Sequence, residues 1–292
     1  MSDFAVNPDI GLWERNAVLN GRNTYYVTGD VEGTLSIKTV LSGEGYWNTP
    51  NGRYRVDPGS YLVLNRGQRY GVEIRSDEIV ETFCMFFRPG FMDSIRETSR
   101  RDWDELLLSE SETSNSTEFY ERLNPGDQSV SPQIEAMRKI VRNGTTSEIE
   151  ADEVMMRLAH ALLQGQQDAI KQRDSLNVAK VSTRDEIYRR LNSARDYMIA
   201  NLDTKADLAA ISHAAALSPF HFHRLFKSAY NQTPHEFLCE IRLAKAKRLL
   251  RDTKSSMSEI AWSVGFESQA AFTKFFTRSA GSTPTAYRMQ VA

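Results

Sequence analysis

The sequence is poor in the residues that build disulfides and metal sites. Its 292 residues include only two cysteines, Cys84 and Cys239, which lie far apart in apolar surroundings. This spacing excludes a disulfide framework and a CxxC metal or redox motif. All five histidines lie at or beyond residue 160, and the one close pair, His221 and His223, is two apart on a predicted helix. Two such side chains do not face one ligand, so we expect no metal site.

Long apolar runs are also missing. No segment approaches the ~18 apolar residues of a membrane span, and the N-terminal residues 1–16 lack a basic patch followed by an apolar stretch. We therefore expect a cytoplasmic protein with no membrane partner. A glycine-rich phosphate loop and a nucleophile elbow are absent as well. The sequence thus predicts no cofactor and no enzymatic activity.

Charge is distributed unevenly along the chain, although the net charge is only -2. Residues 1–175 carry 19 Lys and Arg against 28 Asp and Glu, whereas the remaining residues carry 17 against 10. The C-terminal part is therefore basic. Because Lys and Arg displace the counterions condensed on phosphates, this part fits a polyanionic partner. A basic domain that is merely soluble is the alternative.

The N-terminal part reads as β structure. From about residue 10 to 88 apolar residues alternate with a period near two, as at Leu35 and Ile37, and Gly-containing turn signals such as Asn51-Gly52 and 57–59 separate the runs. Many short strands with glycine turns predict a sandwich or small barrel. After Pro89-Gly90 the pattern becomes helical, so we expect accessory helices over 91–170.

The last third of the chain contains one pattern twice. Residues 208–227 and 258–276 each read as a short apolar helix, a tight turn and a second amphipathic helix, and a continuous helical segment lies between them. Start signals agree: Ser218 precedes Pro219, and capping boxes are predicted at 183–186 and 256–259. Two helix-turn-helix units on one helical strut predict a protein that reads DNA.

The motifs of this region resemble the AraC/XylS family of bacterial transcriptional regulators. They are Arg242-Leu-x-x-Ala-x-x-Leu-Leu, Glu259-Ile-Ala-x-x-Val-Gly-Phe-x-Ser, Phe272-x-x-x-Phe and Gly281-x-x-Pro-x-x-Tyr-Arg. The order of the N-terminal β runs resembles the cupin-like jelly roll that precedes many such regulators. The resemblance implies double-stranded promoter DNA as partner, with recognition helices in successive major grooves about 34 Å apart, and RNA polymerase as a further partner.

The predicted fold class is therefore α+β. A cupin-like barrel or jelly roll with accessory helices is expected over 1–175, a linker over 176–182, and an all-α domain with two helix-turn-helix motifs joined by a long helix over 183–292. The predicted function is sequence-specific transcription regulation, as activator or repressor, under control of a small-molecule effector in the barrel. Control by protein contact without a ligand is the alternative, followed by a cupin-type enzyme fused to a DNA-binding domain.

The apolar face of each second helix determines which residues point outward. In the first unit the exposed aromatic Phe220 can contact a thymine methyl group, and Arg224 can pair with guanine. In the second unit Gln269 can read adenine, whereas Lys274 binds phosphate. The alternative is a solvated helix face. The full predicted DNA-binding set is Phe220, His221, His223, Arg224, Lys227, Ser268, Gln269, Ala270, Thr273 and Lys274.

An effector site is predicted against the aromatic walls of the barrel. Trp47, Tyr54 and Tyr70 are the candidates, with Arg69 as an anion partner. The alternative is that these aromatic side chains simply fill the barrel. A metal-binding cupin needs a cluster of histidines and a carboxylate facing the interior, and this part of the chain has no histidine.

Three further expectations concern assembly and the turns. The apolar stripe of Val154, Met155, Leu158 and Leu162 is either core or a seam between subunits, and we expect a homodimer. Ala216 and Asn231 stand where the family usually has glycine; a left-handed Ala216 costs roughly 1 kcal/mol. We expect the first unit to discriminate bases and the second to act more as an anchor.

Overall fold

A computed structural model describes residues 4–6, 15–104, 118–144, 148–204 and 207–291. The chain divides into two compact units, 1–170 and 171–292, and each is considered by itself. The division falls near the end of helix α3 (Glu148–Asp174), and the next helix, α4, begins at Val181. No helix among the described residues is long and apolar enough to cross a membrane.

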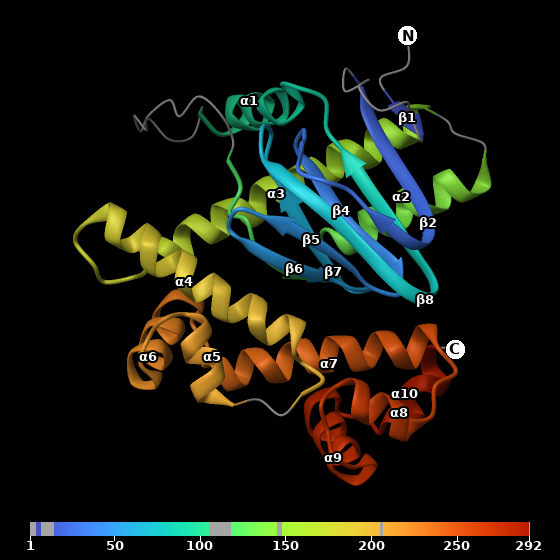
Figure 1. Ribbon diagram of the computed structural model, residues 1–292, viewed down its shortest axis with the longest axis vertical. Helices are drawn as coiled ribbons and strands as arrows, with labels where there is room; N and C mark the ends of the chain where they lie inside the picture. The colour runs from blue at the N-terminus through green and yellow to red at the C-terminus, as the bar shows by residue number, and fades with distance from the viewer. Residues whose placement is uncertain (1–3, 7–14, 105–117, 145–147, 205–206, 292) are drawn as a thin grey trace. The chain divides into compact units, whose positions relative to one another are not determined.

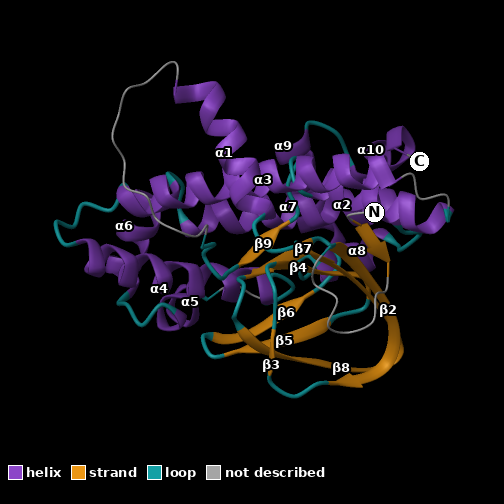
Figure 2. Cartoon of the chain, turned by 90° about the horizontal axis from the view of Figure 1, so that it is seen from above, coloured by secondary structure: helices purple, strands orange, loops and turns teal. Residues whose placement is uncertain are grey.

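The first unit is built on a nearly closed, antiparallel β-barrel, as expected (Figures 1 and 2). The long strand β8 (Arg69–Phe86) is its centre, because it pairs with β2, β3, β4 and β5. The path β1-β2-β8-β4-β7-β9 forms most of the sheet, and among the described strands only β1 and β2 pair in parallel. The other strands are β1 (Phe4–Val6), β2 (Asn16–Val27), β3 (Val31–Glu32), β4 (Ser36–Ser42), β5 (Gly45–Thr49), β6 (Gly52–Val56), β7 (Ser60–Leu64) and β9 (Leu123–Pro125).

Helices α1 (Phe91–Asp104), α2 (Ser131–Asn143) and α3 accompany the barrel, with α2 and α3 passing behind the sheet in Figure 1. Alternate residues of the strands, such as Ile37 and Met85, face these helices and form one apolar cluster with them. The α3 stripe beginning at Val154 is buried in this cluster. The stripe was predicted to be either core or a seam between subunits. It belongs to the core, because its own sheet already covers it.

The second unit is all helical: α4 (Val181–Ala200), α5 (Leu208–Ala214), α6 (Pro219–Tyr230), α7 (Pro234–Asp252), α8 (Met257–Ser263), α9 (Gln269–Ala280) and α10 (Pro284–Val291). Helices α5 and α6 form the first helix-turn-helix, α8 and α9 form the second, and α7 joins them (Figure 1). The two units of the predicted pattern are thus confirmed.

Two of the helix starts follow the predicted signals. Ser218 accepts a hydrogen bond from the His221 amide ahead of Pro219, and Ser256 forms a capping box with Glu259. The capping box predicted at 183–186 is wrong, since the N-cap of α4 is Lys180, three residues before Thr183, and makes no side-chain cap. The first residues of α4 are exposed, and Arg184 and Asp185 in its first turns form ion pairs with Asp174 and Arg173.

The two helix-turn-helix motifs, α5–α6 and α8–α9, are called the first and second reading units below. Their second helices repeat with an offset of 50 residues. Ser218 and Ser268 are N-caps, and Asn231 and Gly281 are left-handed C-caps. Between the N-cap and C-cap, Phe222 and Phe226 of α6 match Phe272 and Phe276 of α9, and all four are fully buried. Leu208, the first residue of α5, is apolar yet 42% exposed, because it lies in the first turn of the helix facing solvent.

Candidate nucleic-acid interface and barrel interior

Helix α6 presents one polar and aromatic row to solvent. Burial of Phe222 and Phe226 fixes the rotation of the helix, so positions 220, 223, 224 and 227 face outward. Phe220 is 75% exposed, an unusual state for so large an apolar side chain. His223, Arg224 and Lys227 are exposed beside it, and His221 is exposed next to the row. The residues of the first reading unit that were predicted to bind DNA are therefore all accessible.

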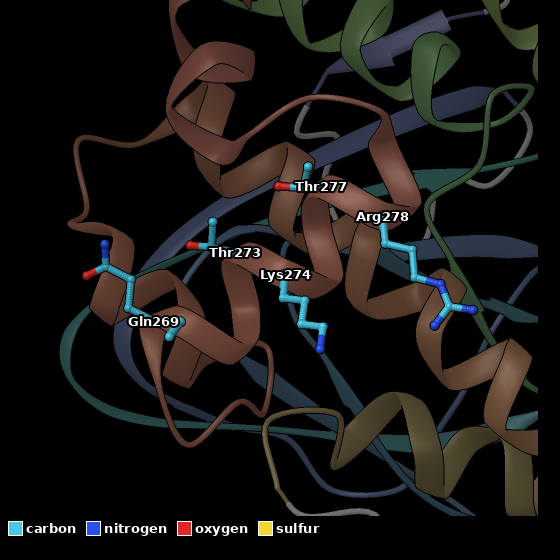
Figure 3. A pocket seen from close by; sticks show the side chains of 6 residues that line it. Gln269, Thr273, Lys274, Thr277 and Arg278 are labelled. Carbon is cyan, nitrogen blue, oxygen red and sulfur yellow. The ribbon is translucent and has the colours of Figure 1, made fainter.

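Helix α9 carries the matching face, along which lies an open groove of about 880 Å³ (Figure 3). Predicted residues Gln269, Ala270, Thr273 and Lys274 line it. Ser268 lies just outside: its hydroxyl accepts a hydrogen bond from the Ala271 amide and caps the helix. Its place is therefore at the start of the reading helix, where any contact with DNA must coexist with the cap.

Two residues of this face were missed by sequence reasoning. Thr277 and Arg278 also line the groove, one helical turn beyond Thr273 and Lys274. The signal for them was present, because a step of four residues keeps a side chain on the same face. Gln269 has a partner within the unit, since its side-chain oxygen accepts a hydrogen bond of 3.0 Å from the Ser258 hydroxyl.

The cations of the two faces differ from those inside the unit. Within the described residues, Arg224 and Lys274 make no salt bridge or side-chain hydrogen bond, whereas Lys227 attracts the Glu236 carboxylate, whose pKa is lowered first by hydrogen bonds from Thr233 and also by this charge. Arg242 and Arg288, in contrast, each donate to two backbone carbonyls. Charges that have no partner in the protein can neutralise phosphates without breaking internal contacts. The outward faces are thus chemically suited to a polyanion.

Three of the four predicted effector residues are buried in the barrel. Trp47 pairs with Tyr54 across the β5–β6 hairpin, and these two and Tyr70 are each less than 9% exposed. Arg69 does not join them: it is exposed, and its Nε lies 2.7 Å from a carboxylate oxygen of Asp30. Consecutive residues of a strand point to opposite faces, so Arg69 and the buried Tyr70 are directed apart.

A buried cation that sequence reasoning missed lies beside Tyr70. Lys38 is 1% exposed, and its Nζ donates a hydrogen bond of 2.8 Å to the Tyr70 hydroxyl. The same Nζ lies 4.1 Å from the centre of the Phe86 ring. Burial lowers the pKa of Lys38 to about 8 and raises the pKa values of Tyr70 and of the nearby Cys84 thiol. The barrel interior therefore contains a positive charge with few polar neighbours.

Period-two alternation explains why Lys38 was missed. The apolar residues Leu35, just before β4, and Ile37, within it, mark one face, which suggests that Lys38 faces solvent. In a barrel backed by helices, both faces of a strand are covered. Among the described residues, no group of three His, Cys, Asp or Glu side chains lies close enough to hold a metal ion.

Two family models match the chain in succession. The AraC-like ligand-binding domain matches residues 21–159, and the helix-turn-helix domain matches residues 211–290. The chain belongs to the AraC family of transcriptional regulators, with a ligand-binding domain followed by a helix-turn-helix domain.

Similar proteins include two regulators. The probable transcriptional regulator LumQ of Photobacterium leiognathi is 36% identical over 93 residues, 32% of this chain and 38% of LumQ. The raffinose operon regulatory protein RafR of Pediococcus pentosaceus is 30% identical over 118 residues, 40% of this chain and 41% of RafR. The chain thus matches about two fifths of the length of these relatives. The DNA-binding domain of AdpA, solved with a target DNA, is 31% identical with a TM-score of 0.34, covering 35% of this chain and 91% of that domain.

Proposed function

We propose that the chain is a sequence-specific DNA-binding transcriptional regulator without catalytic activity. The observation that carries the proposal is the pair of outward faces on α6 and α9, where an exposed Phe220 lies among exposed cations. Lys227 and Lys274 contact phosphates, whereas Phe220, Arg224 and Gln269 contact base edges. Through these contacts the protein recruits or positions RNA polymerase at a promoter.

Selection from a random duplex library tests this proposal. The full chain is expected to enrich a site with two conserved blocks about one helical turn apart, because each reading helix occupies one major groove. Binding to that site is expected to weaken steeply as salt rises, through release of counterions. Enrichment of no sequence, together with salt-independent binding, would reject DNA reading by these faces.

The barrel is the proposed effector site, and its ligand carries an anionic group. Burying an ammonium group without an anionic partner costs several kcal/mol, and Lys38 has one side-chain hydrogen bond among the described residues. A bound carboxylate would accept the remaining Nζ hydrogens, while the aromatic side chains of Trp47, Tyr54 and Phe86 contact its apolar body. Lys38 replaces Arg69 as the anion partner in this proposal, because Arg69 is exposed and paired with Asp30.

Lys38→Met separates this proposal from control without a ligand. Benzoate and a series of alkanoates from acetate to decanoate serve as probes in thermal unfolding of the full chain. At least one is expected to raise the unfolding temperature of the wild type and not of the variant, and the matching neutral amides are expected to raise neither. If no anion acts differently on the two proteins, the anionic effector is rejected and control by protein contact is favoured.

The pH dependence of stability gives an independent check on Lys38. Its folded-state pKa of about 8 lies below the ordinary lysine value of 10.5, so the unfolded chain holds this proton more tightly. The free energy of unfolding therefore rises as pH increases from about 8 to 10.5, by about 3 kcal/mol relative to Lys38→Met. Equal pH profiles for the two proteins would mean that Lys38 is not a buried cation.

A homodimer is proposed through a second stripe on α3. The buried stripe is covered by its own sheet, but Ile149, Met156, Leu163 and Ile170 recur every seven residues along the same helix, and only Leu163 of these packs partly against the core. Ile149 is 74% exposed, Met156 40% and Ile170 37%. Seven-residue spacing is typical of a helix that packs against another helix. Met156→Glu is expected to give a monomer in sedimentation at micromolar concentration, with Gln164→Glu as a control off the stripe; a dimeric Met156→Glu would remove this stripe as the interface.

A further inference from the structure

Arg242 lies near the middle of α7, between the two reading units. The N-terminal part of α7 belongs to the first unit, where the rings of Phe237 and Phe226 lie 5.8 Å apart. Its C-terminal part belongs to the second, where the Lys247 ammonium lies 5.9 Å from the centre of the Tyr287 ring. Arg242 is therefore at the position along α7 where contacts change from one unit to the other.

The Arg242 guanidinium binds the end of α4. Its Nε donates to the Leu202 carbonyl at 3.1 Å and one Nη donates to the Thr204 carbonyl at 2.8 Å. Carbonyls just beyond a helix C-terminus have no intrahelical partner, and a cation is their preferred donor. Helix α4 packs against α5 and α6 of the first helix-turn-helix, so these two charge-assisted hydrogen bonds tie that unit to the middle of α7.

The same guanidinium meets the turn of the second unit. It lies 5.4 Å from the centre of the Phe266 ring, which follows Gly265 in the α8–α9 turn. Gly265 has a φ of +78°, and a Cβ added there would come within 2.4 Å of an Arg242 Nη and 2.5 Å of the Leu202 oxygen. Glycine is required here for space as well as for its backbone angles. The end of α4, the middle of α7 and the second turn meet in one close contact.

We propose that Leu202, Arg242 and Gly265 form a junction that fixes the second reading unit against the first, and so sets the spacing between DNA half-sites that the protein accepts. The inference rests on the proposed function, because spacing matters only if both units read DNA. Arg242 is a positioning residue in this scheme and contacts no base. A rigid junction holds the two reading helices ready for one spacing, and a loosened one lowers the effective concentration of the second helix at its block.

The test uses the full chain and the site that the wild type selects from random duplexes. Affinity is measured on that site, on its first block alone, and on versions with two base pairs inserted between the blocks, which rotates the second block by about 70°. The wild type is expected to lose affinity by roughly 30-fold on the insertion. Arg242→Met is expected to bind the selected site ~10-fold more weakly, to lose less than ~3-fold on the insertion, and to bind the single block like the wild type.

Arg288→Met is the matched control. Arg288 also donates to two carbonyls, those of Leu250 and Ser255, but these lie at the end of α7 and just before α8, within the second unit. This variant is expected to keep the wild-type penalty for the insertion. Arg242→Lys, which retains charge without the two-pronged geometry, is expected to fall between Arg242→Met and the wild type.

If folded Arg242→Met loses as much affinity on the two-base-pair insertion as the wild type does, the proposed junction is rejected. If Arg242→Met fails to fold, Arg242→Lys decides, and a wild-type penalty in that variant overturns the proposal equally. A wild type that selects only one block, or none, contradicts the proposed function instead. The two failures are therefore distinguishable.

Discussion

The two reading units share a plan but differ at the turn between their helices. Ala216 holds the left-handed turn of the first unit with a φ of 49°, and Gly265 holds the corresponding turn of the second with a φ of 78°. The backbone conformations are similar, so the angle alone does not explain the different residues. At Gly265 there is no room for a methyl group, because Leu202 and Arg242 lie against it.

On the outward faces it is the first reading unit that has the larger side chains. At matching positions the first unit has Phe220 and Arg224 where the second has Ala270 and Lys274. An arginine can pair with guanine through two hydrogen bonds, whereas a lysine acts as a point charge. In the second reading unit, packing against Leu202 and Arg242 restricts the residue at the turn. The turn of the first unit accommodates the methyl group of Ala216, and that unit differs mainly at its exposed face.

The largest effect is expected for Gly265→Ala. The substitution adds backbone strain of about 1–2 kcal/mol and a clash with Arg242 and Leu202, so unfolding of α8 and α9 should become easier by about 3 kcal/mol or more. Hydrogen exchange of peptides from these helices measures the change. Gly281→Ala is the control, because its φ is +77° and nothing lies within 4 Å of the added Cβ. Equal losses in the two variants would show that strain alone acts at Gly265.

The next largest effect is expected for Arg224 and Lys274, the cations at matching positions of α6 and α9. Arg224→Ala should weaken binding to the selected site by about 1–3 kcal/mol and relax specificity at one base step. Lys274→Ala should weaken binding less and similarly on all sequences, with a shallower salt dependence, because a phosphate contact carries no sequence information. Reversed behaviour, measured by binding to single-base variants of the site, would exchange the roles of the two units.

A smaller loss is expected for Phe220→Ala. The side chain is 75% exposed, so its removal should leave the unfolding temperature nearly unchanged. Binding should weaken by about 1 kcal/mol where the site has a thymine methyl under Phe220, and by less where uracil replaces that thymine. An equal loss on both duplexes would remove the methyl contact.

The smallest effect is expected for Ala216→Gly, and it has the opposite sign. Glycine relieves the strain at φ 49°, although it also adds freedom to the unfolded chain, so the net gain should be roughly 0.5–1 kcal/mol. Hydrogen exchange of α5 and α6 should slow, while α8 and α9 remain unchanged. Destabilisation of α5 would mean that the Ala216 methyl group makes a necessary contact.

The sequence predicted the reading domain well because its signals are local. Ser218 before Pro219, the capping box at Ser256 and Glu259, and the buried phenylalanines at a step of four each specify structure within one helical turn. Predictions that depend on distant neighbours did less well. Whether the Val154 stripe is core or interface depends on the sheet that covers it, and periodicity cannot answer that.

The candidate site shows the same limit. Phe220 and Arg224 could be placed on the outward face from helical spacing alone, and the structure exposes both. Lys38 was missed because barrel closure covers both faces of β4. Arg69 was misjudged as a neighbour of the aromatic residues, although strand alternation directs it away from Tyr70. The contact between Arg242 and Gly265 likewise depends on the packing of three segments.

The exposed ring of Phe220 also has a calorimetric consequence. Burial of an apolar surface on binding gives a negative change in heat capacity. Contacts with phosphates instead add to the binding free energy through counterion release. A site that places a methyl group under this ring should therefore show a more negative heat-capacity change than an unrelated sequence. Since hydrophobic association weakens on cooling, preference for the correct site should decline in the cold.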